Sequence, residues 1–258
     1  MTGHKPCAPQ GLKLDGKVYF RLFYDGAHYA GWSKQKDKPT VQCVLENALL
    51  KTGCVVKRIK AFSRTDGGVS SLSQIIALEG LSVRPLAANR VLPKDVAITH
   101  YATHLGKVSS KTYVYVKKGR WLHPEVVNEA YSKLNREGGL NKLYKKGGAT
   151  PSESCQIEFL STATNEFIFF RARGFGYQQV RRIVGYLTLA DSTGTPPTQF
   201  SSVHSANPRG LILVKISDDG ANWVMLEEGL IKVRRYLSSK ISDLEWSLSV
   251  YRCMFALV

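Results

Sequence analysis

Two features that the sequence lacks restrict the kind of protein that it can encode. It has no uninterrupted apolar run long enough to span a bilayer, so no segment is predicted to cross a membrane. Its five cysteines are odd in number, widely spaced and include no Cys-x-x-Cys pair. That pattern argues against a disulfide framework and a zinc site, and it is typical of proteins in a reducing compartment.

Targeting and metal-binding patterns are missing as well. The first residues lack the apolar segment of a secretory signal peptide, so we expect residues 1–16 to form a flexible polar leader and the cytoplasm to be the compartment. His100 and His104 are four residues apart, but they lie in a strand-like segment with no neighbouring cysteine. We therefore predict no metal site there.

Acidic residues are scarce relative to basic ones. The chain has 36 Lys and Arg against 20 Asp and Glu, which gives a net charge of +16. A field of this sign attracts polyanions and speeds their arrival, so nucleic acid is the predicted partner. An anionic membrane surface, an acidic protein or a surface tuned for solubility are the alternatives, although the excess is large for solubility alone.

The order of hydrophobic segments predicts an α+β protein made of two similar halves, 17–106 and 107–258. No low-complexity linker separates them, so packed halves fit better than independent domains. In the first half we expect strands at 18–24, 55–62, 72–78 and 97–104, a helix capped by Thr40 and ended by Gly53, and a short helix at 86–91. In the second half we expect strands at 111–116, 157–163, 166–172 and 210–216, helices at 124–136 and 177–190, and a helical tail from about 223.

The loop SRTDGG at 63–68 is the strongest candidate for chemistry. Asp66 follows an apolar strand, so the core holds the loop, and the glycines after it allow another backbone or a ligand to approach closely. An Asp before Gly-Gly is also a common turn residue, whose side chain bonds nearby backbone amides. The loop by itself does not decide between the two interpretations.

The second half offers partners for this carboxylate. Arg181 and Arg182 lie near the start of a predicted amphipathic helix. Basic residues at such positions are normally solvated, but a guanidinium beside Asp66 would fix its rotamer and stabilise its negative charge. Tyr113 would supply a flat surface on which a base could pack.

Several motifs in the right order resemble those of the tRNA pseudouridine synthase A family. They are YDGAHYAGWSKQ with PTVQCVLENAL, then SRTDGGVSS, KTYVYV, FGYQQVRRIVGYL and PRGLILVKI. Ser70 stands where bacterial members usually have His, so the chain is similar to archaeal and eukaryotic-type members. The stretch 136–154 is shorter, and the tail after Ile216 longer, than in the family pattern.

The resemblance implies two ferredoxin-like halves whose sheets meet at a central basic active-site cleft. It implies conversion of uridine to pseudouridine in the tRNA anticodon stem–loop, at nucleotides 38, 39 or 40, by a homodimer that uses no cofactor or metal. By resemblance, Asp66 is the catalytic residue and Arg64 extrudes the target base. Tyr113 packs on that base, and Arg181 pairs with the aspartate.

The expected reaction breaks the bond between C1′ and N1, turns the freed uracil and joins C1′ to C5. A carboxylate could attack C1′ or remove a proton from the sugar, and the sequence does not separate these routes. An inserted Arg could offset the cost of unstacking the base. Two other functions stay open: a catalytically silent RNA-binding or RNA-folding factor on the same scaffold, and a generic basic RNA-binding module. A silent protein would not need Asp66, Tyr113 and Arg181 together.

Overall fold

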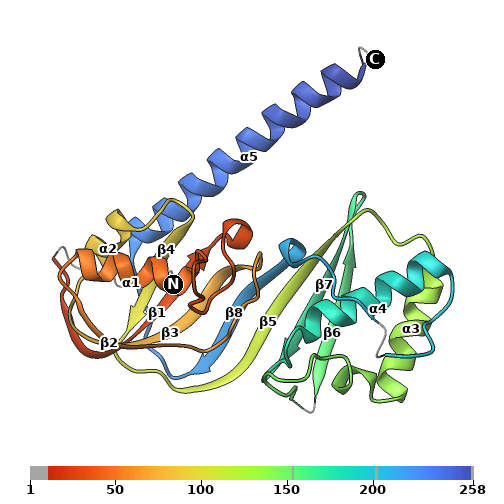
Figure 1. Ribbon diagram of the computed structural model, residues 1–258, viewed down its shortest axis with the longest axis horizontal. Coiled ribbons are helices and arrows are strands. Elements are labelled where there is room, and N and C mark those ends of the chain that lie inside the picture. The colour runs from red at the N-terminus through yellow and green to blue at the C-terminus, as the bar shows by residue number, and fades with distance from the viewer. Residues whose placement is uncertain (1–10, 153, 201–202, 257–258) are drawn as a thin grey trace, which may run out of the picture.

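The computed structural model describes residues 11–152, 154–200 and 203–256, so most of the predicted leader lies outside the described residues. The fold mixes helices and strands, with one large and mostly antiparallel sheet and five α-helices in this described part (Figure 1). Helices α1, α2 and α5 lie with one half of the sheet and α3 and α4 with the other (Figure 1). In the described residues, no helix is both long enough and apolar enough to cross a membrane.

The first half contains four strands that pair antiparallel, with β1 between β3 and β4 and with β2 on β3. Its elements are β1 (Leu14–Tyr24), the 3-10 turn η1 (Gly26–His28), α1 (Val41–Lys51), β2 (Val55–Ala61), β3 (Ser70–Val83), α2 (Pro85–Val91) and β4 (Val96–Ala102). Strand β1 begins inside the stretch predicted to be a flexible leader, because Leu14 pairs with Val83 of β3. Strand β3 is also longer than predicted.

Helix α1 shows how local sequence sets an element. The Thr40 side chain accepts a hydrogen bond from the Cys43 backbone N–H, which satisfies one of the free amides at the helix start. Apolar residues four apart, including Val41 and Leu45, face the core and are fully buried. Gly53, with φ +78°, follows the last turn.

The second half repeats the pairing order of the first, with β5 between β7 and β8 and with β6 on β7, all antiparallel. Its elements are β5 (Lys107–Lys118), α3 (Pro124–Arg136), η2 (Gly139–Asn141), β6 (Cys155–Ser161), β7 (Asn165–Ala172), α4 (Gln179–Thr193), η3 (Pro208–Gly210) and β8 (Leu211–Asp219). The bounds of α3 match the predicted helix, and β6 and β7 form the predicted hairpin.

The halves join into one sheet through β3 and β8, which run parallel. The registered pairs are Ser70 with Ile212 and Ser71 with Leu213, and the buried Ser71 hydroxyl donates to the Leu213 carbonyl. Each half has a main hydrophobic core, and Val69 and Ile75 of the first half pack in the core of the second. The junction follows the SRTDGG loop directly, so that loop lies where the two halves meet.

Two further elements follow β8 in the second half. Strand β9 (Val224–Met225) pairs with β4 at the outer edge of the first half, where the sequence predicted helix. Helix α5 (Glu227–Ala256) then runs away from the body of the molecule (Figure 1).

Candidate active site

The loop that carries Asp66 is anchored from below by buried polar side chains. Gln74, fully buried on β3, accepts from the Ser63 backbone N–H and donates to the Ser63 carbonyl. The Thr65 hydroxyl lies 2.8 Å from the Tyr24 hydroxyl at the end of β1. These bonds satisfy the buried polar groups of the loop and hold its backbone in one conformation.

A second loop, residues 26–32, braces the first from the side. The Trp32 N–H donates to the Thr65 carbonyl, and the Gly68 N–H donates to the Tyr29 carbonyl. Gly31 forms an isolated bridge with Asp66, and its φ is +110°. A Cβ at Gly31 would lie 2.7 Å from the Thr65 oxygen, so only glycine fits this close approach. The glycine of the sequence YAGW therefore supports the Asp66 loop.

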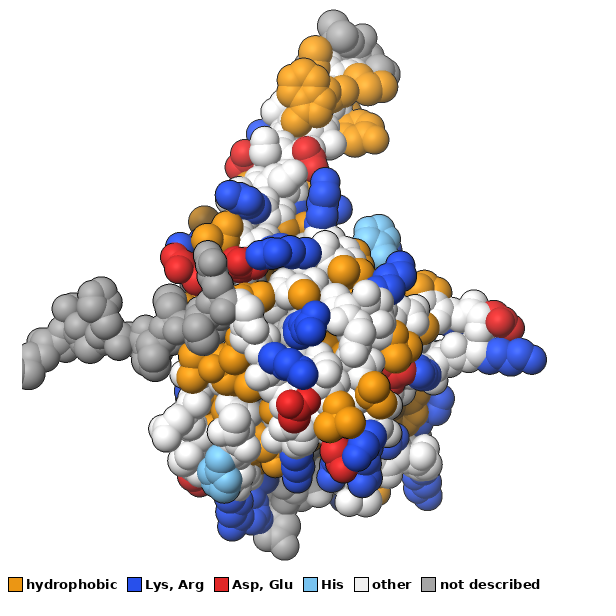
Figure 2. Space-filling model, turned by 90° about the vertical axis from the view of Figure 1, so that its left-hand side faces the viewer, with side chains coloured by type: hydrophobic (Ala, Val, Ile, Leu, Met, Phe, Trp, Pro, Cys, Tyr) orange, Lys and Arg blue, Asp and Glu red, His pale blue; other side chains and the backbone are white. Residues whose placement is uncertain are grey.

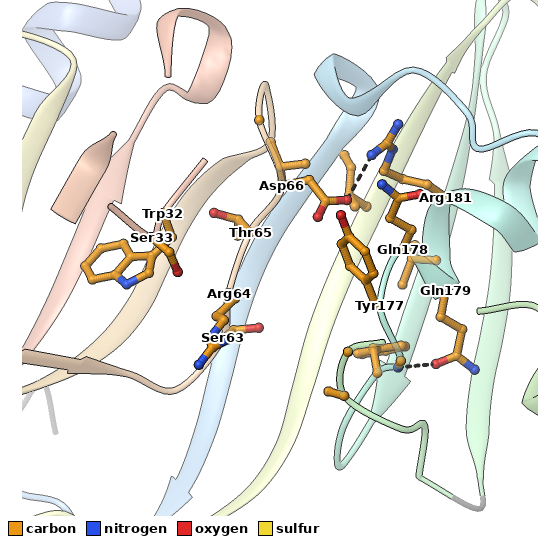
Figure 3. A pocket seen from close by; sticks show the side chains of 18 of the residues that line it. Trp32, Ser33, Ser63, Arg64, Thr65, Asp66, Tyr177, Gln178, Gln179 and Arg181 are labelled. Carbon is orange, nitrogen blue, oxygen red and sulfur yellow. Dashed lines mark hydrogen bonds and ion pairs between the residues drawn. The ribbon is translucent and has the colours of Figure 1, made fainter. Parts of the chain in front are cut away.

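The structure brings Asp66 and Arg181 together across the junction between the halves. Arg181 Nη1 donates to Asp66 Oδ2 at 2.8 Å (Figure 3). Arg181 Nε donates to the Ala206 carbonyl, also at 2.8 Å. The Arg181 side chain is mostly buried in the first turns of α4. A guanidinium held on two sides fixes the direction in which the carboxylate points.

Tyr113 is buried nearby and is fixed at both ends of its ring. Its hydroxyl lies 2.6 Å from the Ser63 hydroxyl, and its ring meets Phe175 edge to face at 5.2 Å. Burial raises the pKa of the Tyr113 hydroxyl well above its usual value, so the side chain stays neutral at physiological pH. Tyr113 is therefore a rigid, uncharged aromatic group at the site.

These residues line one cavity of about 910 Å³, which receives side chains from both halves. Figure 3 shows Trp32, Arg64 and Asp66 on one side and Tyr177, Gln178 and Arg181 on the other. Arg64 is exposed on the same loop as Asp66. All four residues that the sequence singled out, Asp66, Arg64, Tyr113 and Arg181, therefore line the same cavity.

Sequence reasoning missed Lys111, another cation in the cavity wall. It precedes Tyr113 by two positions on β5, and residues two apart on a strand share a face. The Lys-x-Tyr spacing was thus the available signal. Burial lowers the pKa of the Lys111 ammonium. With Arg64 and Arg181, Lys111 gives the described part of the lining three cations against the single carboxylate of Asp66.

The short stretch 136–154 forms another part of the wall that the sequence did not reveal. Gly147, Gly148 and Ala149 line the cavity, and the Tyr177 N–H donates to the Ala149 carbonyl. The Gln179 amide joins this stretch to α4 by donating to the Leu140 carbonyl. Although this stretch is short, it forms one side of the cavity.

Comparison with known proteins identifies relatives over nearly the whole chain. A protein named tRNA pseudouridine synthase A from Archaeoglobus fulgidus is 30% identical over 248 residues, which cover 88% of this chain and 91% of that protein. Proteins of the same name from Nitrosomonas eutropha and Pyrococcus abyssi are 26% identical (91% of each chain) and 25% identical (87% of this chain, 93% of that protein).

Two further comparisons add nothing to this result. A scan against models of protein families found no match. A solved structure of an unknown protein from Galdieria sulphuraria is 15% identical, covers 69% of this chain and 92% of its own, and has a TM-score of 0.21, which is too low to bear on the fold. The identity and coverage of the archaeal relative decide the matter: the chain belongs to the tRNA pseudouridine synthase A family, a family of isomerases.

Proposed function

We propose that this protein converts uridine to pseudouridine in tRNA, with Asp66 as the catalytic carboxylate. The observation that carries the proposal is the ion pair between Asp66 and Arg181 in the wall of a shared cavity. A cavity of about 910 Å³ is within the size range of small-molecule sites, so an extruded nucleoside has room. The relatives' common name supports the same reaction.

Asp66 has one carboxylate oxygen engaged and one available. Arg181 bonds Oδ2, and among the described residues no donor bonds Oδ1. In the proposed reaction Oδ1 faces the sugar, where it attacks C1′ or removes a sugar proton while the bond from C1′ to N1 breaks. Both routes use the fixed rotamer that Arg181 imposes.

Tyr113 and Arg64 are assigned to handling the base. Tyr113 is a neutral ring held by Ser63 and Phe175, which suits it to pack against uracil and limit its movement after detachment. Arg64 is exposed next to Asp66, where it can enter the space that the extruded base leaves in the stem. Lys111 and the other cations of the wall favour a phosphate-bearing substrate.

We extend the proposal to the domain architecture, the target nucleotides, the oligomeric state and the compartment. We interpret 17–106 and 107–258 as two ferredoxin-like halves, supported by their common order of strands and helices. By the family resemblance, we propose the anticodon stem–loop, at nucleotides 38, 39 or 40, as the target. The same resemblance supports a homodimer that works in the cytoplasm.

A pseudouridine assay on an unmodified tRNA transcript tests the reaction. Wild type should modify uridines of the anticodon arm, and Asp66→Asn should modify none while binding tRNA with nearly unchanged affinity. Asp219→Asn is the matched control, because Asp219 is exposed at the end of β8 and away from the cavity lining. If wild type binds tRNA but isomerises no uridine, the silent RNA-binding function replaces this proposal.

A further inference from the structure

Among the residues that the structure describes, helix α5 contacts the body through its first part. The Lys232 ammonium donates to the carbonyls of Asn89 and Leu92 at the end of α2, both at 2.7 Å. The Tyr236 hydroxyl donates to Asp25 Oδ2 at 2.5 Å. From 241 to 255 every side chain is exposed, and this part of α5 extends beyond the body (Figures 1 and 2).

The extended part carries an apolar stripe along one side, and three further exposed apolar side chains, Trp246, Val250 and Met254, lie on the other side of the helix. Hydrophobic side chains gather at the far end of the protrusion in Figure 2. The exposed fractions of the stripe residues run from 50% to 87%. The spacing alternates between three and four positions, which is the repeat of a helix that packs against another helix. A helical segment of this length is only marginally stable alone in water. The residues of this stripe are Ile241, Leu244, Leu248, Tyr251 and Phe255.

The charges beside the stripe favour a second copy of the same segment. Glu245 and Arg252 flank it on one side, seven positions apart, and among the described residues neither forms an ion pair within the chain. In an antiparallel pair centred on Leu248, Glu245 lies beside Arg252 of the partner subunit. The twofold axis repeats that contact, so one chain supplies both complementary charges.

The apolar residues fit the same arrangement. Around Leu248, the antiparallel register places Leu244 against the partner's Tyr251 and Ile241 against the partner's Phe255. Each aromatic ring therefore meets an aliphatic side chain, which fills space more evenly than ring against ring. We propose that residues 241–255 of α5 pair antiparallel with the same segment of a second copy of this chain. This inference rests on the homodimer in the proposed function and assigns its interface.

Sedimentation velocity of the full chain tests the proposal. Wild type should sediment as a dimer at micromolar concentration. Leu248→Glu should be monomeric there, because it places two carboxylates together at the centre of the apolar contact. Val250→Glu is the matched control, since Val250 lies on the opposite side of the same helix and should leave the dimer intact. Both sites are exposed in the single chain, so a circular dichroism melt should show the body unchanged.

Charge reversal then tests the antiparallel register. Glu245→Arg should weaken association about fivefold, because two repulsive pairs replace two attractive ones. Adding Arg252→Glu to that variant should restore the wild-type dissociation constant. A wild-type chain that stays monomeric, a dimer that Leu248→Glu leaves intact, or a double variant no better than Glu245→Arg would each overturn the proposal. The pseudouridine assay on wild type judges the reaction separately, whatever the state of association.

Discussion

Arg181 Nη1 lies 2.8 Å from Asp66 Oδ2, and this contact joins a loop of the first half to a helix of the second. The guanidinium is also held by the Ala206 carbonyl, which anchors it to the second half. The loop of Asp66 is fixed by Gln74 and Gly31 in the first half. The direction of the carboxylate therefore depends on how the two halves join at β3 and β8.

Arg181→Lys should lower the rate of uridine isomerisation about a hundredfold. An ammonium is a point donor without the planar fork, so it cannot hold Ala206 and Asp66 in the same geometry. Single-turnover kinetics on a tRNA transcript measure the effect, and tRNA affinity should change little. The matched control is Arg235→Lys, on the exposed side of α5, which should keep the wild-type rate. An equal loss of affinity and rate in Arg181→Lys would indicate a role in binding instead.

Substitutions at Tyr113 should distinguish the contribution of its ring from the contribution of its hydroxyl. Tyr113→Phe keeps the edge contact with Phe175 but leaves the buried Ser63 hydroxyl without its partner, so stability should fall by about 1 kcal/mol. Its isomerisation rate should stay close to wild type. Tyr113→Ala should lose about ten- to a hundredfold in activity, because the packing surface for the base is gone. A Phe variant as inactive as the Ala variant would assign the chemistry to the hydroxyl.

Gly31→Ala should destabilise the fold by about 2 kcal/mol or more, since the new Cβ would press on the Thr65 carbonyl. Gly119→Ala is the matched control, because Gly119 also has a positive φ but has open space around its Cβ position. That variant should lose only about 1 kcal/mol, from backbone strain. Urea unfolding of the two variants measures the difference. Equal losses of stability in the two variants would mean that the close approach of the two loops at Gly31 does not affect the stability of the fold.

Binding of tRNA should weaken steeply with salt. The net charge of +16 and the cations of the cavity wall imply contacts to phosphates that release counterions. Affinity should fall by at least about tenfold between roughly 50 and 200 mM salt, as measured by filter binding with unmodified transcript. A flat response would contradict the interpretation of the net charge as a nucleic-acid signal.

Local sequence was enough to predict many of the elements. The Thr40 cap, the Pro124 start of α3 and the turn between β6 and β7 each depend on residues close together in the chain. The loop of Asp66 could be located because a strand and two glycines mark it. The family motifs then singled out Tyr113 and Arg181, and the structure places both beside that loop.

The tertiary structure decided the features that depend on pairing between segments far apart in the chain. Lys111 and the wall at 147–149 reach the cavity only after the second half has folded, and β9 forms because β4 offers a free edge. The parallel junction of β3 and β8 has no local signal, since a crossover links strands far apart in the chain. The sequence by itself thus singled out the candidate site residues. Only the packing of the two halves decided that they share one cavity, because side chains far apart in the chain converge only where the strands that carry them pair.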